Sequence, residues 1–132
     1  MQRFEPGESW PVIQNIFHIT YVRNPGAAFG ILSFRTSFFI IISLLMIAFL
    51  IFGEYIFPWW RRFPRLCLAL LLGGTAGNLF DRIVSGSVVD FLDFRIWPVF
   101  NAADMALVIG IILLAYSLIK DNAQLTMHNA QL

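Results

Sequence analysis

Four of the five aspartates in this chain lie between Gly73 and Asp104, and the stretches on either side are hydrophobic. The whole sequence is 58% hydrophobic and only 13% charged. Carboxylates are costly to place beside lipid-soluble segments, so their concentration in one stretch indicates a functional site. The polar side chains of this stretch that could do chemistry are Asn78, Asp81, Arg82, Asp90, Asp93, Arg95, Asn101 and Asp104.

Asp90 and Asp104 are the pair that the sequence favours for hydrolysis. When two carboxylates converge on one water molecule, repulsion between their charges leaves one ionised and the other protonated. The ionised group takes a proton from the attacking water, and the protonated group donates one to the scissile carbonyl. A helix N-terminus would favour Asp104 as the ionised member of a pair that titrates as a unit. Spacing alone leaves a structural role for Asp104 open, because such a carboxylate is stabilised whether or not it does chemistry.

The length and composition indicate a single membrane domain, residues 1–132, with no nucleic-acid partner. The mean hydropathy of +0.73 and the 14 phenylalanines indicate that most apolar surface is covered by lipid. A net charge of +1 offers no basic field for nucleic acid. Cys67 is the single cysteine, and His18 has no second ligand at metal spacing. The sequence therefore predicts no disulfide, metal or cofactor.

Three apolar runs must position these side chains, and they predict a membrane all-α bundle. The run from Thr36 to Gly53 contains no charged residue. At about 1.5 Å per residue it approaches the roughly 30 Å of a hydrocarbon core. Asn101 is a good N-cap for the last run, with Asp104 at the third helical position. The predicted spanning helices lie at about 36–57, 66–82 and 103–120, followed by a polar tail at 121–132.

The second run, Leu66 to Phe80, reaches only about 22 Å. Asp81 and Arg82 would then lie at or slightly below the outer membrane surface, held by protein or water. They could form an ion pair at the helix end or help to shape a site. A GxxxG pattern at Gly73 and Gly77 predicts close packing of this helix against a neighbour.

A small sheet on the extracytoplasmic side is expected from the two segments outside the helices, residues 1–35 and 83–101. The aromatic and basic residues between positions 54 and 65 should face the cytoplasm, which orients both segments outward. Strand-like alternation at 16–22 and 88–94 predicts a sheet over the site. Asp90 and Asp93 would point to its opposite faces.

Four sequence blocks resemble the lipoprotein signal peptidase family, signal peptidase II, in their order and approximate spacing. Together they cover the chain from about residue 13 to residue 120, and four blocks in register are highly specific. The blocks are Asn24-Pro-Gly-Ala-Ala-Phe-Gly30, Gly73-Gly-x-x-Gly-Asn-x-x-Asp-Arg82, Gly86-x-Val-Val-Asp-Phe91 and Phe100-Asn-x-Ala-Asp104.

The resemblance implies an aspartic endopeptidase of the bacterial cytoplasmic (inner) membrane, with its active site on the extracytoplasmic side and membrane lipid around it. Its substrates would be diacylglyceryl-modified prolipoproteins, cut just before the lipidated cysteine, and the peptide globomycin would block it. The dyad would be Asp90 and Asp104. The residues that would line or support the site are Asn24, Asn78, Asp81, Arg82 and Asn101.

Members of this family resemble four-helix proteins, whereas three spans are predicted here. We expect this sequence to lack the family's first helix, through a truncated or misassigned start or as a natural three-span form. Two other classes stay open. A truncated, inactive membrane protein would bind lipidated precursors without turnover. A small membrane transporter would show internal repeats and charges near the bilayer midplane, and the sequence shows neither.

Overall fold

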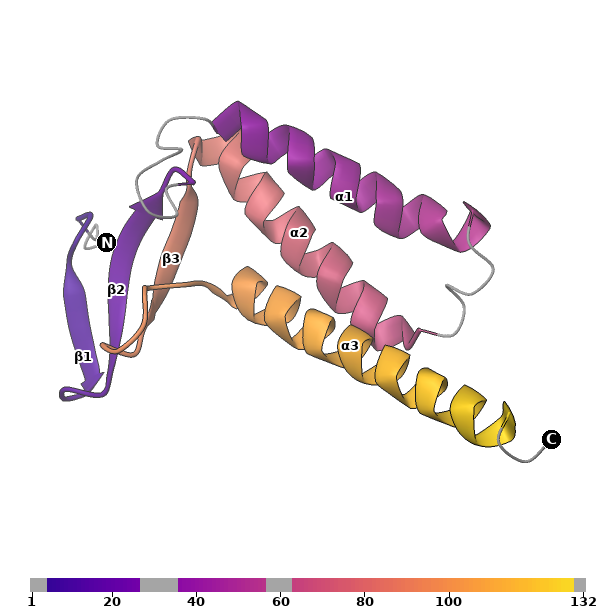
Figure 1. Cartoon of the computed structure of the whole chain (residues 1–132). Helices are drawn as coiled ribbons and strands as arrows, with labels where there is room; N and C mark the ends of the chain where they lie inside the picture. The colour runs from indigo at the N-terminus through magenta and orange to yellow at the C-terminus, as the bar shows by residue number, and fades with distance from the viewer. Residues whose placement is uncertain (1–4, 27–35, 57–62, 130–132) are drawn as a thin grey trace.

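The computed structural model describes residues 5–26, 36–56 and 63–129, and these form long helices with a small antiparallel sheet at one end (Figure 1). The predicted membrane all-α bundle with a small β element is therefore confirmed. The elements in chain order are β1 (Ser9–Ile13), β2 (Phe17–Asn24), α1 (Thr36–Ile56), α2 (Arg65–Ser85), β3 (Val88–Asp93) and α3 (Ala102–Asn129).

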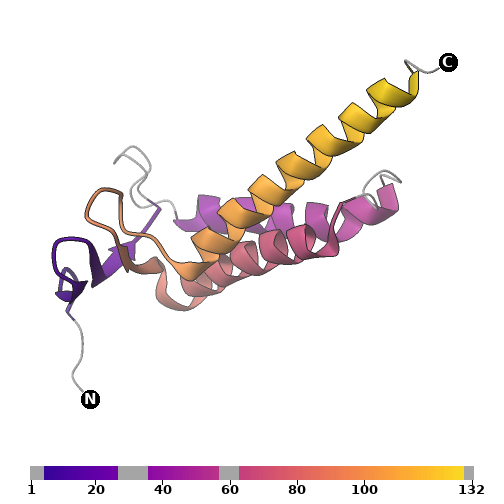
Figure 2. The ribbon, with the colours of Figure 1, turned by 90° about the horizontal axis from the view of Figure 1, so that it is seen from below.

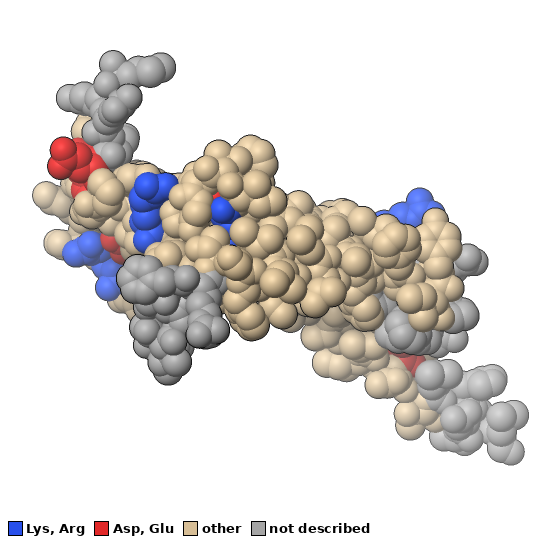
Figure 3. Space-filling model, turned by 90° about the horizontal axis from the view of Figure 1, so that it is seen from above, with Lys and Arg blue, Asp and Glu red and all other residues tan. Residues whose placement is uncertain are grey.

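All three of these helices are long and apolar enough to cross a membrane, judged by length and composition. Large apolar side chains such as Ile41, Leu45 and Phe52 on α1 are exposed, as expected of side chains that face lipid. On the face shown in Figure 3, charged side chains gather toward the two ends of the molecule, and the middle of the helical stretch shows none. This distribution fits a protein whose middle lies in hydrocarbon.

Two predicted helix ends are wrong, and both helices are longer than the apolar runs. The second helix has 21 residues, about 31 Å, so it is not a short span. It ends where Gly86 adopts φ 71° and donates its N–H to the Arg82 carbonyl at 3.0 Å. The predicted polar tail is helical as far as Asn129, because residues 121–129 contain no glycine or proline to end α3.

The helix α2 lies between α1 and α3, and the C-terminal part of α3 runs away from the other two helices (Figure 2). The contact with α3 uses Gly74 and Gly77 instead of the predicted Gly73 and Gly77. A Cβ at Gly74 would lie 2.6 Å from the Ala103 carbonyl oxygen, whereas a Cβ at Gly73 would meet nothing within 4 Å. Helix rotation therefore decides which small residue allows the close approach.

The sheet has the order β1-β2-β3, with both pairs antiparallel. Its second and third strands confirm the predicted sheet. The first strand was not predicted, because it follows a polar and turn-rich start of the chain and contains a proline at position 11, which cannot donate a backbone hydrogen bond. In β2, the register between Ile19 and Val22 spans one more residue than its partner segment Asp90–Leu92, which marks a β-bulge.

Candidate active site

Two structural elements bring Asp90 and Asp104 to the same end of the bundle. Asp90 lies in β3, and Asp104 lies in the first turn of α3. The chain between them folds back on β3, since Leu92 and Phe100 form an isolated antiparallel bridge. The next residue, Asn101, is therefore placed between the strand and the helix.

The amide side chains of Asn78 and Asn101 connect the two carboxylates. The Nδ2 of Asn101 donates to Asp90 Oδ1 at 2.8 Å and to Asn78 Oδ1 at 3.0 Å. The Nδ2 of Asn78 in turn donates to Asp104 Oδ1 at 2.8 Å. Both asparagines are buried, at 8% and 4% exposed. The two carboxylates are thus members of one buried hydrogen-bond network.

Asn101 and Asp104 also form a reciprocal cap at the start of α3. The Asp104 backbone N–H donates to Asn101 Oδ1 at 2.9 Å, and the Asn101 N–H donates to Asp104 Oδ2 at 3.3 Å. The predicted N-cap is therefore confirmed. The same asparagine caps the helix and contacts Asp90, so helix formation and site assembly depend on one side chain.

Asn24 holds the second oxygen of Asp90. Its Nδ2 donates to Asp90 Oδ2 at 2.9 Å, while its own oxygen accepts the Gly26 N–H at 2.9 Å. Gly26 has φ 102°, and a Cβ there would collide with the ring of Phe39. The backbone donor fixes the orientation of the amide, so the amino group faces the carboxylate. The rest of the predicted Asn24 block, residues 27–30, lies outside the described residues.

Burial dominates the electrostatics of Asp90, which is only 2% exposed. Desolvation raises the pKa of Asp90 above its ordinary value, although the bonds from Asn24 and Asn101 act in the opposite direction. The nearby charge of Asp104 raises this pKa further, and the charge of Arg82 lowers it. Burial therefore favours the protonated form of Asp90.

Asp81 and Arg82 have different positions although they are adjacent in the sequence. Asp81 accepts the backbone N–H of Val89 at 3.2 Å, which ties the end of α2 to the start of β3. The Arg82 guanidinium lies 5.1 Å from the centre of the Phe39 ring, and its Nη1 donates to the Asn78 carbonyl at 3.3 Å. Arg82 thus borders the dyad, and Asp81 supports the strand that carries it.

The structure therefore brings together Asn24, Asn78, Asn101 and the two aspartates, with Arg82 beside them. Phe39 also borders the site, against both Arg82 and Gly26, and it was not predicted from the sequence. No sequence signal could have found it, because it is one apolar residue within a charge-free run. In the described part of the chain, no group of three His, Cys, Asp or Glu side chains is placed to hold a metal ion.

An apolar cavity of about 760 Å³ opens beside Asp104. Its walls come from Leu92 in β3, from the segment after β3 and from the first turns of α3. The lining residues are Leu92, Phe94, Ile96, Trp97, Phe100, Asp104, Met105, Val108 and Ile109. Asp104 is the only charged residue among them, so an apolar ligand seated here would lie next to one of the two carboxylates.

Comparison with known proteins identifies the family. A family model described as signal peptidase (SPase) II matches residues 1–120. The chain belongs to the signal peptidase II family. It is 53% identical over 116 residues to the lipoprotein signal peptidase of Moorella thermoacetica, covering 88% of this chain and 77% of the relative. Over 123 residues it is 48% identical to that of Desulfitobacterium hafniense, covering 92% of this chain and 82% of the relative.

The fold agrees with this membership. A solved structure of a bacterial membrane enzyme superposes with a TM-score of 0.81 at 39% identity, covering 92% of this chain and 76% of that chain. A second, also described as a bacterial membrane enzyme, gives a TM-score of 0.79 at the same identity, covering 91% and 80%. The chain is thus a membrane protein of an aspartic peptidase family.

Proposed function

We propose that this protein removes signal peptides from diacylglyceryl-modified bacterial prolipoproteins by cutting before the lipidated cysteine, with Asp90 and Asp104 as its catalytic pair. The observation that carries the proposal is the buried amide network, in which Asn78 and Asn101 join the two carboxylates. No metal or cofactor takes part in the proposed reaction. Asn24, Arg82 and Asp81 support the site in the ways described above.

In the proposed reaction, a water molecule is held between the two carboxylates. Ionised Asp104, at the positive end of the α3 dipole, takes a proton from this water as its oxygen attacks the scissile carbonyl carbon. Asp90 carries a proton and donates it to the carbonyl oxygen, which forms a neutral tetrahedral intermediate. Collapse of this intermediate breaks the C–N bond as the leaving amine receives the proton from Asp104. One hydroxyl of the intermediate returns a proton to Asp90, so the products are a carboxylic acid and an amine, and both aspartates regain their starting states.

Several features support a lipidated substrate and an outward-facing site. The cavity beside Asp104 is almost entirely apolar in its lining, which suits the apolar part of a lipid-modified peptide. In the sequence, Arg61 and Arg62 come just before Arg65, and Arg65 begins α2 at the end of the bundle opposite the sheet. Because basic residues favour the cytoplasmic side, we place the dyad at the extracytoplasmic surface of the bacterial inner membrane, among its lipids. We also expect globomycin to block the site.

A cleavage assay on the purified chain in lipid or detergent tests the proposal. The substrate is a diacylglyceryl-modified prolipoprotein peptide, and mass spectrometry of the products locates the cut. We expect cleavage at the bond before the lipidated cysteine, no cleavage of the same peptide without the lipid, and inhibition by globomycin. Binding of the lipidated peptide without any product would instead favour an inactive binding protein.

The cleavage rate should depend on pH in a bell shape, because the reaction needs one proton on the pair. As the pH rises, Asp90 loses the proton that it must donate, and the rate falls. Burial raises the pKa of Asp90, so this alkaline limb should lie above the ordinary range of an aspartate. On the acid side, the rate falls when the ionised partner takes up a proton. A profile of kcat/KM against pH with a single limb would contradict this assignment.

A further inference from the structure

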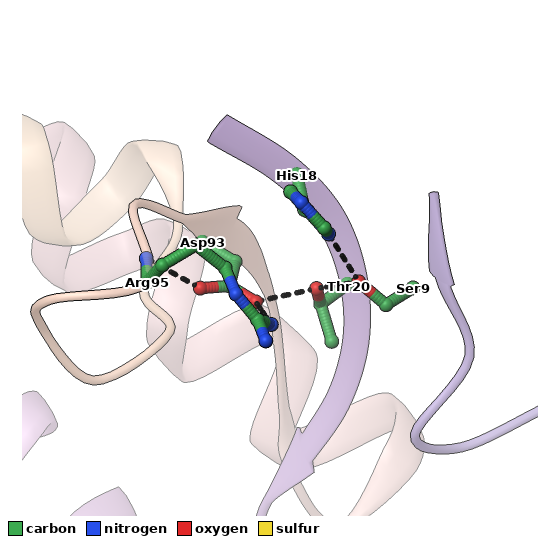
Figure 4. Close-up of polar contacts among 5 residues, drawn as sticks. All are labelled: Ser9, His18, Thr20, Asp93 and Arg95. Atoms are coloured by element: carbon green, nitrogen blue, oxygen red, sulfur yellow. Dashed lines mark hydrogen bonds and ion pairs between the residues drawn. The ribbon is translucent and has the colours of Figure 1, made fainter. Parts of the chain in front are cut away.

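A second polar cluster crosses the sheet away from the catalytic pair, with buried Thr20 and Asp93 at its centre. It links Ser9 on β1, His18 and Thr20 on β2, Asp93 on β3 and Arg95 just after β3 (Figure 4). The register pairs Ser9 with Thr20 and His18 with Asp93, so these four side chains share one face of the sheet. Asp93 is three positions after Asp90 in β3, and side chains alternate along a strand, so the cluster lies on the face opposite Asp90.

The hydrogen bonds of this cluster run in one direction. Thr20 has a single hydroxyl hydrogen, which it donates to Asp93 Oδ2 at 2.7 Å. Ser9 must then donate to Thr20 at 2.8 Å, and His18 Nδ1 must donate to Ser9 at 3.0 Å. The other ring nitrogen of His18, Nε2, is buried and has no hydrogen-bond partner in the described part of the chain. Every donor in the series points toward the Asp93 carboxylate.

Asp93 is held in its ionised form by these donors. Besides the Thr20 bond, it accepts the Arg95 backbone N–H at 2.9 Å and Arg95 Nη1 at 3.0 Å. The Thr20 hydroxyl, followed by the bonds from Arg95, holds the pKa of Asp93 below its ordinary value. The carboxylate is only 4% exposed, so losing one donor leaves a buried acceptor underpaired.

The bond from Arg95 to Asp93 fixes the turn that returns the chain to the active site. Arg95 has φ 64°, a left-handed conformation that is costly for a residue with a side chain. Its N–H bond to Asp93 offsets this cost. The turn brings the Phe94 and Phe100 rings into a stack at 5.9 Å, and Phe100 then donates its N–H to the Leu92 carbonyl at 3.1 Å. The residue after Phe100 is Asn101, whose side chain donates to Asp90 Oδ1 and whose backbone N–H donates to Asp104 Oδ2.

We propose that Thr20 and Asp93 are positioning residues for the peptidase reaction, which set the place of Asn101 against Asp90 from the far face of the sheet. The proposal rests on the proposed function of the dyad. Its physical basis is one connected path of hydrogen bonds and backbone. The path runs from the Thr20 hydroxyl through Asp93 and the left-handed Arg95 into the loop 94–100, which Phe100 closes by its bonds to β3. A displacement of the loop by a fraction of an ångström would lengthen the bond from Asn101 to Asp90.

The variant Thr20→Val keeps the side-chain shape but removes the hydroxyl donor. We expect it to lower kcat by about tenfold, because displaced catalytic groups lose rate steeply, while KM changes by less than about twofold. It should also move the alkaline limb of the pH profile upward by about one pH unit, since a weaker bond from Asn101 stabilises ionised Asp90 less. The other charged groups that face Asp90, Asp104 on α3 and Arg82 on α2, are unchanged in this variant.

Two matched variants show whether the hydroxyl itself is responsible. Thr20→Ser restores the donor and should return kcat and the alkaline limb to wild-type values. Glu8→Gln removes a charge from the exposed end of the same sheet and should behave as wild type. If Thr20→Val does not fold, judged by its thermal unfolding midpoint, Asp93→Asn is measured in its place and should show the same change in kcat and pH profile.

Three outcomes would overturn the proposal: a wild-type kcat and alkaline limb in Thr20→Val, no rescue by Thr20→Ser, or loss of folding in both Thr20→Val and Asp93→Asn. The last would mean that the cluster only holds the sheet together. Failure of the proposed function is distinguishable from all three, because it would show as absence of cleavage by the wild-type chain.

Discussion

Replacing either Asp90 or Asp104 by asparagine is expected to lower the cleavage rate by at least about a thousandfold, because each variant removes one of the two proton-transfer groups. An amide at position 104 cannot take the proton of the attacking water. An amide at position 90 cannot supply the proton to the carbonyl oxygen. The measurement is single-turnover cleavage of the lipidated peptide, with its affinity for each variant determined separately. The affinity should change little, since the exchange is nearly isosteric.

At position 90, an asparagine would also lack an acceptor that the aspartate provides, because two amide donors point at this side chain. The amide orientations of Asn24 and Asn101 are fixed by the backbone N–H groups of Gly26 and Asp104, so both amino groups point at residue 90. An asparagine there must place its own amino group against one of these donors. The control is Asp121→Asn, which makes the same chemical change farther along α3 and should leave the rate unaltered. A wild-type rate in either dyad variant would mean that other residues catalyse the reaction.

Gly74→Ala is expected to destabilise the protein by about 1–3 kcal/mol, because the added methyl group overpacks the contact between α2 and α3. Its Cβ would lie 2.6 Å from the Ala103 carbonyl oxygen and 2.8 Å from Leu107 Cγ. The backbone of Ala103 adjoins Asp104, so the cleavage rate should fall together with the thermal unfolding midpoint. Both are measured in the same detergent.

The matched control for this prediction is Gly73→Ala, one position earlier on the same helix. A Cβ at Gly73 meets nothing within 4 Å, so the exchange adds helix propensity without a clash. We expect its unfolding midpoint to equal or exceed that of the wild type. If both variants unfolded at the same temperature, close approach of the two helices at Gly74 would not be a source of stability.

Features that depend on neighbours within about four residues could be predicted from the sequence. The apolar runs located the three helices, because the cost of placing charge and unpaired backbone in lipid acts on each segment independently. The cap of α3 followed from Asn101 and Asp104 being three residues apart. The strand character of residues 17–22 and 88–93 followed from their alternation. The ends of α2 and α3 were misplaced because a helix continues beyond the apolar run until a residue such as Gly86 stops it.

Contacts between distant segments were decided only by the tertiary structure. The site residues carried by the family resemblance are separated by up to 80 positions, and no local pattern states that Asn78 bonds to Asp104 or that Asn24 bonds to Asp90. Likewise, whether Gly73 or Gly74 faces α3 depends on the rotation of one helix against another. The chain by itself thus determined which segments cross the membrane and which carboxylates are candidates. The packing of β3 and α3 against α2 determined that two of them share one network, because hydrogen bonds form only where folding has already brought their partners together.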